Sequence, residues 1–395
     1  MGKVIDVVVG GAYGSESKGR VTAALIGQIY TAQPDAYVTC IRVAGPNAGH
    51  IVWATPPKPK DGPRPTEPEK FAMRQIPVGF VHPHCRLYIG PGSEVNPDVL
   101  SDELNMLEQA GYHNIRERLY ISPQATWLTH DHIAAEKSLV GAIGSTGKGI
   151  GAARADRLMR NAKLISEFPT IGDLIPERNL VELHEQINAV NNERVVIEGT
   201  QGFGLGLHAG HYPKCTSSDC RAIDMMAMSG VTPWSTVDTL VNIHLVIRPF
   251  PIRVAGDSGP LAGETNWADL GLPVEYTTVT QKPRRVGQFD AELVQRAVIA
   301  NGADRVQLHL AMADQLVPEC KHMSSYHDLL VLAPESRQTL VKFLQSVPYN
   351  WRIRSLGTGP LSQIWLAKNQ LEDLYTQTSW EDAGFKRVDA GQLDR

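Results

Sequence analysis

The sequence has little of what marks disulfide-rich, membrane-spanning or nucleic-acid-binding proteins. Its five cysteines are odd in number and show no Cys-x-x-Cys spacing, which argues against a disulfide framework and a structural zinc site. No apolar run approaches the roughly 18 residues of a membrane-spanning helix, and the amino terminus lacks the long apolar stretch of a signal peptide. The net charge of −4 comes with no basic stripe. We therefore expect a cytoplasmic protein with no membrane or nucleic-acid partner.

The pattern of apolar residues predicts an α/β fold, with a large, mostly parallel twisted sheet flanked by helices. A short apolar run at 4–9 is followed by a glycine turn and by helical spacing of Val21, Leu25 and Ile29. Further buried strands are predicted at 37–43, 86–89, 195–197, 243–247 and 306–310, and helices at 97–110 and 292–301. Without an internal repeat or a clear linker, we expect 1–395 to be one domain with insertions, and the Pro-rich stretch 55–69 to be a solvated surface loop.

A glycine-rich loop follows the first predicted strand and spans residues 10–20, with the sequence GGAYGSESKGR. Glycines let backbone N–H groups approach a phosphate, and the start of the next helix and Lys18 add positive charge. The loop is not a Walker A loop, because it contains no Gly-Lys followed by Ser or Thr at the required spacing. By itself it indicates either a phosphate site or a structural turn.

Four other segments carry polar or cationic groups that suit oxyanions, bases or carboxylates. They are 45–50, which ends in His50 after a strand; 144–151, with four glycines; 198–202, with hydroxyls downstream; and 280–285, with three cations. Each also has an ordinary structural explanation. These are, in order, a surface histidine, a flexible glycine loop, common turn residues and a solvated charge cluster.

Taken together and in this order, the segments resemble the adenylosuccinate synthetase family. The family's opening pattern, close to GxQWGDEGKGK, is matched by 11–20, and its NAGH by 47–50. Its GTTGRGIGP, EGAQG, TTGRPRR and STGP are matched by 144–152, 198–202, 279–285 and 357–360. The resemblance covers residues 4 to about 366. It implies a fold related to the P-loop NTPases, a Mg²⁺ cofactor and a homodimer. It also implies a ligase that joins L-aspartate to a purine nucleotide with hydrolysis of a nucleoside triphosphate.

The resemblance also implies roles for individual residues. The catalytic positions are Ser15, Lys18 and His50. The donor nucleotide and its phosphates would be bound by Gly14, Glu16, Ser17, Gly19, Arg20, Gly49, Ile51, Arg284, Gly357, Thr358 and Gly359. The purine monophosphate would be bound by Ser15, Asn47, Ala48, Ser145, Thr146, Arg160, Gln201, Thr216 and Lys282, with Arg160 reaching the partner's site. Aspartate would be bound by Thr280, Gln281, Lys282 and Arg284, and the metal by Ser15 and Gly49.

Three positions depart from the family's pattern. Ser15 replaces the catalytic aspartate, and Gln281 replaces a glycine. The segment 309–311 (His-Leu-Ala) is aligned with the Lys-x-Asp that reads guanine in the donor, although Asp314 is an alternative acceptor three residues further on. A serine leaves room for the 2-amino group of guanine and accepts its hydrogen bond. The sequence thus resembles a phage branch of the family, the 2-aminoadenylosuccinate synthetases, which use dGMP. We expect dGMP, L-aspartate and ATP or dATP as substrates.

Two other functions stay open. An ordinary adenylosuccinate synthetase would act on IMP, and Ser15 argues against it. A catalytically inactive nucleotide sensor is supported by the loss of the aspartate. The transfer machinery is kept, however, in Lys18, His50, Lys282 and Arg284. A Rossmann oxidoreductase is disfavoured because the first loop lacks GxGxxG.

Overall fold

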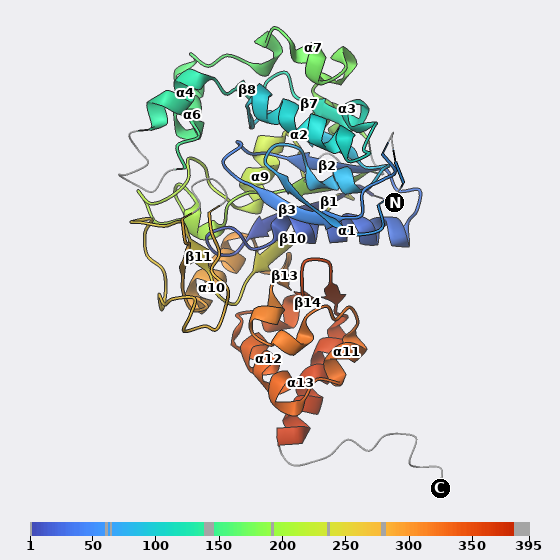
Figure 1. Ribbon diagram of the computed structural model, residues 1–395, viewed down its shortest axis with the longest axis vertical. Helices are drawn as coiled ribbons and strands as arrows, with labels where there is room; N and C mark the ends of the chain where they lie inside the picture. Colours follow the sequence, from blue (N-terminus) through green and yellow to red (C-terminus); the bar gives the residue numbers. More distant parts are fainter. Residues whose placement is uncertain are drawn as a thin grey trace.

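The fold is built on a nine-stranded sheet, seen in a computed structural model that describes residues 2–59, 62–63, 65–137, 146–190, 193–234, 238–277 and 282–382 (Figure 1). The strand order is β15-β14-β13-β10-β1-β9-β2-β5-β7. All neighbouring pairs are parallel except β14 and β15. Their bounds are β1 Val4–Gly10, β2 Val38–Arg42, β5 Arg86–Ile89, β7 Leu119–Ile121, β9 Arg194–Glu198, β10 Leu240–Ile247, β13 Val306–Leu310, β14 Ile353–Gly357 and β15 Gln363–Trp365. The prediction of a mostly parallel α/β sheet is confirmed.

Three two-stranded sheets stand beside the large sheet. They are β3 (His50–Ala54) with β4 (Glu69–Met73), β6 (Glu94–Val95) with β8 (Thr126–Trp127), and β11 (Ile252–Arg253) with β12 (Arg285–Val286). The β3–β4 hairpin lies against α1, which is the helix that begins at the first loop. The hairpin thereby brings His50, its first residue, to that loop.

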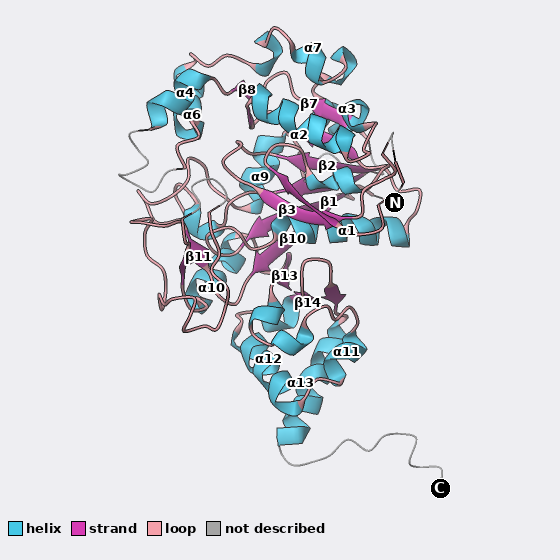
Figure 2. Ribbon diagram, in the orientation of Figure 1, coloured by secondary structure: helices cyan, strands magenta, loops and turns pink. Residues whose placement is uncertain are grey.

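Helices cover both faces of the sheet (Figure 2). In β1 the side chains of Ile5, Val7 and Val9 join one buried cluster and that of Val8 joins another, as the alternation of a strand requires. The helices are α1 Lys18–Ala32, α2 Pro97–Gln109, α3 Ile115–Arg118, α4 His130–Glu136, α6 Ile150–Met159, α7 Ile171–Leu174, α8 Leu183–Ala189, α9 Ala222–Ser229, α10 Ala291–Ala300, α11 Tyr326–Leu330, α12 Pro334–Ser346 and α13 Lys368–Asp382. The last three lie together at one end of the molecule (Figure 1).

Local sequence explains where the predicted helices begin. Helix α2 has Pro97 at its first position, and the side chain of Asn96 accepts a hydrogen bond from the backbone N–H of Val99 at 3.1 Å. Helix α10 is capped in the same way by Asp290, which accepts from Leu293 at 2.9 Å. Helix α1 has no side-chain cap. The backbone N–H groups of its first turn are therefore free of a side-chain cap and face the glycine-rich loop and any ligand bound there. None of the helices among the described residues is long and apolar enough to span a membrane.

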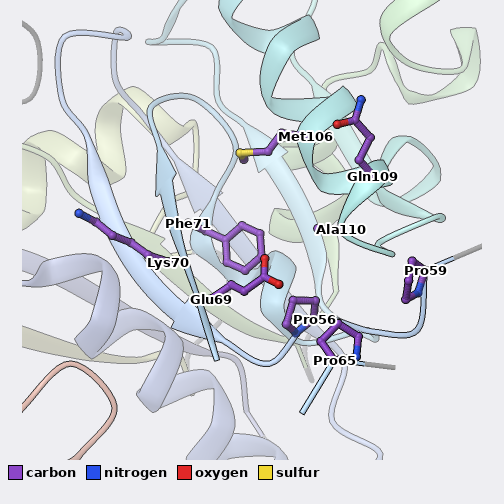
Figure 3. Close-up of a pocket in the computed structure, with 9 residues that line it drawn as sticks. All are labelled: Pro56, Pro59, Pro65, Glu69, Lys70, Phe71, Met106, Gln109 and Ala110. Atoms are coloured by element: carbon purple, nitrogen blue, oxygen red, sulfur yellow. The ribbon is translucent and has the colours of Figure 1, made fainter. Parts of the chain in front are cut away.

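The Pro-rich stretch 55–69 is only partly the solvated loop that its composition predicts. Pro56 is buried, and a side chain on Gly111, just after α2, would collide with the backbone of Pro57 at 2.7 Å. The described part of the stretch packs beside α2 and forms a hollow of about 440 Å³ with Phe71 and Met106 (Figure 3). The rings of Pro56, Pro59 and Pro65 are apolar and line this hollow, which the hydrophilic composition of the stretch concealed.

Candidate active site

Of the predicted site segments, 10–20, 45–50, 198–202 and 357–360 lie at the carboxyl edge of the sheet. Segments 11–17, 43–49, 199–203, 248–251, 311–315 and 358–360 follow β1, β2, β9, β10, β13 and β14, which are six adjacent strands. Loops at the carboxyl ends of parallel strands are where open α/β sheets bind their ligands. Segments far apart in the sequence therefore form one site.

The first loop is folded around its own carboxylate. Glu16 is fully buried and accepts hydrogen bonds from the backbone N–H groups of Ala12 at 2.7 Å and Gly14 at 3.2 Å. Its other oxygen pairs with the ammonium group of Lys18 at 2.8 Å. The loop thus holds an anion with backbone donors and a cation, the arrangement predicted for phosphate. A bound phosphate would share Lys18 with Glu16.

Several residues in and beside this loop have left-handed backbone conformations. The φ angles are +86° at Gly14, +53° at Ser15, +65° at Ser17 and +61° at Gln201. A side chain on Gly202 would lie 2.6 Å from the backbone of Ala12 and Gly14, so the loop after β9 packs directly on the first loop. Strained backbone of this kind is concentrated at functional sites, where the surroundings hold it in place.

His50 reaches the site from β3 and is held by a buried ion pair. Its Nδ1 faces a carboxylate oxygen of Glu198, which also accepts from the guanidinium of Arg42 at 2.6 Å. The other oxygen of Glu198 accepts from the backbone of Val78 at 2.8 Å. A side chain on Gly19 would meet Cβ of His50 at 2.8 Å, so glycine lets the histidine approach α1. Because Nδ1 faces Glu198, Nε2 is the ring nitrogen left for a ligand.

The surroundings of His50 lower both its own pKa and that of Glu198. Burial and the nearby charge of Arg42 lower the pKa of His50 to about 4, although Glu198 opposes this. Burial is the largest influence on Glu198 and disfavours its ionisation, but the charge of Arg42 together with the interactions of His50 and the backbone of Val78 outweighs burial and lowers the pKa of that carboxyl. Without bound nucleotide, His50 is therefore a neutral imidazole at neutral pH.

Ser15 joins the first loop to the basic segment 282–285. Its side chain is exposed, and its hydroxyl oxygen accepts a hydrogen bond from Nη1 of Arg284 at 2.9 Å. Its backbone carbonyl accepts from buried Arg248 at 3.0 Å, and Arg248 pairs with Glu275 at 2.5 Å. A serine and an arginine 269 residues apart thus lie in hydrogen-bonding contact.

The segments after β13 and β14 correct the alignment of the donor-base site. His309 is fully buried between β10 and β14, where it hydrogen-bonds His244 at 2.9 Å and Ser355 at 2.7 Å. Ala311 is also buried. Neither is available to a nucleotide base, so the predicted alignment of 309–311 with Lys-x-Asp is wrong. The half-exposed carboxylate of Asp314 is the acceptor that the structure offers there.

Arg20 lies close to this acceptor. Its Nη1 donates to the carbonyl of Gly359, while its Nε and Nη2 are buried with no partner among the described residues. Burial lowers the pKa of Arg20 to about 10, and the charge of Asp314 opposes the shift. Thr358 is fully buried, and its hydroxyl is engaged by the backbone of Met323 at 2.5 Å. Its backbone N–H donates to Ser362 at 3.1 Å and its carbonyl accepts from His322 at 2.8 Å. Each polar group of Thr358 thus has a partner within the protein, contrary to the donor-binding role predicted for it.

The other predicted residues are placed as follows. Asn47 and Ala48 are half-buried in the segment before His50, Gly49 and Ile51 are exposed, Thr216 is half-buried, and Thr146 and Lys282 are exposed. Arg160 directly follows α6 and has a left-handed conformation with φ +66°. It belongs to none of the loops at the carboxyl edge of the sheet. Ser145, Thr280 and Gln281 lie outside the described residues.

Four site residues were missed by sequence reasoning or given no role. Arg42 and Glu198 position His50, and Arg248 and Glu275 hold the backbone of Ser15. Charged residues at the ends of apolar strands were the available signal, because a fully buried charge requires a partner. The sequence alone does not say which partner each one has.

A magnesium ion fits these residues only as a companion of the triphosphate. Ser15 and Gly49, the predicted ligands, offer neutral oxygens, and the hydroxyl of Ser15 already contacts Arg284. In the described part of the chain, no group of three or more His, Cys, Asp or Glu side chains is arranged to hold a metal. Mg²⁺ keeps several waters and is often bound largely through substrate phosphates.

Comparisons with known proteins agree on one family. A family model described as adenylosuccinate synthetase matches residues 7–174 and 176–328. The adenylosuccinate synthetase of Archaeoglobus fulgidus is 34% identical over 366 residues, covering 91% of this chain and 96% of its own. That of Pyrococcus horikoshii is 35% identical over 329 residues, covering 82% and 88%.

Two solved structures have the same fold. One is the cyanophage S-2L succinoaminodeoxyadenylate synthetase (PurZ), bound to dGMP and to dATP as an energy donor. It has a TM-score of 0.71 and 26% identity, and the match covers 96% of this chain and 100% of that one. The other is the fully ligated adenylosuccinate synthetase of Plasmodium falciparum, with a TM-score of 0.70 and 19% identity, covering 92% and 99%. The second likeness shows the fold alone.

Proposed function

This chain belongs to the adenylosuccinate synthetase family, and from that premise we propose that it joins L-aspartate to C6 of dGMP with ATP or dATP as the donor. The family consists of C–N ligases that use a purine nucleotide, aspartate and a triphosphate. The product would be 2-amino-2'-deoxy-N6-succinyladenylate, a precursor of 2-aminoadenine for DNA. The observation that carries the choice of dGMP is the exposed hydroxyl of Ser15 where the family has an aspartate.

The environment of Ser15 supports a 2-aminopurine. The hydroxyl accepts from Arg284, and a hydroxyl oxygen has a second lone pair that can accept from the 2-amino group of guanine. Hypoxanthine presents only a C–H at that position. Asparagine and aspartate tolerate the left-handed backbone of residue 15 better than serine does. The backbone conformation therefore does not account for a serine at position 15, which favours a role of its side chain in binding the ligand.

Lys18 and His50 would act on the transferring phosphoryl group. The 6-oxygen of the purine attacks the γ-phosphorus, N1 of the purine gives its proton to solvent, the bond to the β-γ bridging oxygen breaks, and the nucleoside diphosphate leaves. The amine of aspartate then attacks C6, phosphate leaves, and the amine gives one proton to solvent. Lys18 would neutralise phosphate oxygens in the first loop, and Nε2 of His50 would face the 6-oxygen and the phosphoryl group. Catalysis by positioned charges of this kind suits a loose transition state. When bound, Mg²⁺ would neutralise the phosphates of the donor.

Arg284 and Lys282 would bind aspartate. Arg284 is held at the site by the hydroxyl of Ser15 and by the carbonyl of Tyr276 at 3.2 Å, and it has no ion pair among the described residues. A guanidinium without a carboxylate partner is suited to bidentate binding of a substrate carboxylate. Its neighbour Arg285 is instead engaged by Glu264 at 2.6 Å. Arg285 therefore serves the structure.

ATP or dATP is proposed as the donor because PurZ, which shares the fold at 26% identity, was solved with dATP. The sequence-based argument for adenine, the lack of an acceptor at Ala311, falls with the corrected alignment. Asp314 can accept one hydrogen bond from the 6-amino group of adenine, and it can accept two from guanine. Competition between ATP, dATP and GTP therefore tests this part of the proposal separately.

A homodimer in which Arg160 reaches the partner's purine site is part of the proposal. Arg160 is exposed at the end of α6 and follows Leu158 and Met159, whose exposed fractions are 76% and 69%. Two exposed apolar side chains beside an arginine suit the rim of an interface. Sedimentation of the protein gives the oligomeric state. If Arg160 completes the partner's site, Arg160→Ala should raise the KM for the purine monophosphate without changing that state.

The test of the proposed function is a turnover assay that crosses dGMP, GMP and IMP with ATP, dATP and GTP at saturating L-aspartate. The highest kcat/KM is expected for dGMP. The second candidate is ordinary adenylosuccinate synthesis from IMP, which the relatives of 34% and 35% identity favour by their names. A preference for IMP would establish that candidate. No phosphate release with any combination would identify a nucleotide sensor.

A further inference from the structure

We propose that a polar cavity at the amino edge of the sheet, opposite the loops described above, binds a nucleoside monophosphate. The cavity measures about 370 Å³ and lies between α1 and the strands β1, β10, β13, β14 and β15. Residues that line it include Asp6, Arg194, His244, Arg354 and Trp365. The size is at the small end of the roughly 300–1,000 Å³ of ligand pockets.

The cavity is separate from the candidate active site. Asp6 stands four residues before Gly10 in β1, which at ~3.3 Å per residue is ~13 Å from the start of the first loop. Arg194 is the first residue of β9, and Arg354 is the second residue of β14. In a parallel sheet these positions share the edge opposite the carboxyl ends. A ligand here would therefore not compete with the substrates.

The floor of the cavity is a row of buried polar side chains that satisfy one another. Asp6 accepts hydrogen bonds from Asn242 at 2.9 Å and from Nε2 of His244 at 3.1 Å. Because Nε2 of His244 carries the proton, its Nδ1 accepts from His309 at 2.9 Å. His309 in turn accepts from the hydroxyl of Ser355 at 2.7 Å. This chain of bonds fixes the floor and does not need a ligand.

The rim of the cavity, in contrast, carries cationic groups without matching acceptors. Arg354 donates only to the backbone carbonyls of Trp351 at 3.1 Å and Ile353 at 3.0 Å, and it forms no ion pair among the described residues. One guanidinium nitrogen of Arg194, Nη2, forms an ion pair with Asp6 at 3.1 Å, while its Nε is buried with no partner among those residues. Two arginines against one carboxylate leave a net positive charge. Guanidinium groups in this situation suit a phosphate.

The remaining wall indicates the rest of the ligand. The half-exposed ring of Trp365 packs edge-on against His309, with ring centroids 5.6 Å apart, and so is held in one orientation. Leu25 and Leu366 add apolar surface, and the amides of Gln28 and Gln307 add donors and acceptors. An indole for stacking, amides for a polar edge and an arginine for phosphate together fit a mononucleotide. Inorganic phosphate alone would leave the indole and the amides without a role.

The test measures binding of dAMP, dGMP and inorganic phosphate by titration calorimetry, using the full-length protein and its variants. Lys18→Ala weakens the phosphate site of the first loop and leaves the cavity intact. Arg354→Gln removes the rim cation. Arg352→Gln is the matched control, because that neighbouring guanidinium is paired with Asp304 at 3.3 Å outside the cavity. Melting temperatures check that each variant is folded.

We expect mononucleotide binding that survives Lys18→Ala and Arg352→Gln and that Arg354→Gln weakens about ten- to a hundredfold, as loss of a charged hydrogen bond implies. If Arg354→Gln fails to fold, Arg354→Lys keeps the charge, loses the fork geometry and should weaken binding by a smaller factor. Binding that Arg354→Gln leaves unchanged would overturn the proposal, whether or not Lys18→Ala weakens it. Equally tight binding of inorganic phosphate would overturn the mononucleotide assignment. Neither result depends on which purine the active site uses.

Discussion

Ser15→Asp is the sharpest perturbation of the proposed acceptor site. The substitution restores the family's carboxylate at a position where the serine hydroxyl lies 2.9 Å from Nη1 of Arg284. Aspartate is compatible with the φ of +53°, so the loop should keep its shape. The new carboxylate would form an ion pair with Arg284 and would occupy the space beside the purine's 2-position.

The size of the effect follows from two terms. Loss of the hydrogen bond between the hydroxyl and the 2-amino group costs ~1 kcal/mol. Crowding of the 2-amino group by the longer side chain costs a further ~1–3 kcal/mol, as overpacking does in cores. Together these lower kcat/KM for dGMP by roughly 30- to 1,000-fold. IMP lacks the 2-amino group and escapes the crowding, so the ratio of the two substrates should shift toward IMP.

The assay is steady-state release of phosphate with dGMP or IMP varied at saturating L-aspartate and donor. Ser15→Asn is the matched control, because asparagine has the shape of aspartate without its charge. If crowding of the 2-amino group causes the effect, kcat/KM for dGMP should fall in both variants. If the ion pair with Arg284 causes it, kcat/KM for dGMP should fall only in Ser15→Asp, and the KM of that variant for aspartate should rise as well. An unchanged ratio of kcat/KM for dGMP and IMP in Ser15→Asp would refute the role given to Ser15.

Four further predictions concern other parts of the molecule. His50→Ala and Lys18→Ala should each lower kcat by ~10²–10³-fold, because each removes a preorganised charge or donor; kcat and KM measured separately on the folded variants check this. Arg284→Ala should raise the KM for aspartate by about tenfold, the value of one charged hydrogen bond. Asp314→Ala should raise the KM of the donor by a similar factor with little change in kcat, and the change should be compared for ATP, dATP and GTP. His309 has a pKa well below its usual value because it is buried. The unfolded chain therefore binds a proton below about pH 6.5 that the native protein does not. The free energy of unfolding should therefore decrease as the pH is lowered through that range. His309→Gln should reduce the slope of this free energy against pH by up to ~1.4 kcal/mol per pH unit, measured by urea unfolding at several pH values.

Controls for these predictions come from neighbouring residues with structural roles. Arg285→Ala removes a cation paired with Glu264 and should leave the KM for aspartate unchanged. An equal rise in both arginine variants would mean that the segment acts only as bulk charge. For the pH prediction, Ser355→Ala removes a hydrogen bond to the same ring but no titrating group. A slope that His309→Gln leaves intact would assign the acid sensitivity to other histidines with a lowered pKa, such as half-buried His82.

The large sheet could be predicted because buried parallel strands are continuous apolar runs. Strands 86–89 and 306–310 have the predicted bounds, and the predicted helix 97–110 differs from α2 by one residue. Strand β10 begins at Leu240, three residues before the prediction, because half-exposed Asn242 interrupts the apolar pattern. The three small sheets were not predicted. Their strands have two to five residues and carry no long apolar run.

The candidate site was only partly accessible from the sequence, since its loops are local but its contacts are not. Glycine-rich segments can be recognised from their composition. The pairs that hold the catalytic groups join residues far apart: 156 positions separate Arg42 from Glu198, and 269 separate Ser15 from Arg284. The error at His309 has the same origin. His309 was aligned with a residue that reads the donor base, whereas partners on two neighbouring strands allow its polar side chain to be buried inside the sheet.

The distribution of charge at the carboxyl edge explains why a serine suffices at position 15. Lys18, Arg42 and Arg248 are each paired with a buried or half-buried carboxylate. Arg20 and Arg284 have no ion pair among the described residues, and they lie at the segments proposed to bind the donor and aspartate. Both ligands are anionic, so each would bring the missing partner itself. A carboxylate at position 15 would neutralise Arg284 in advance, whereas a hydroxyl orients it and leaves its charge for the substrate.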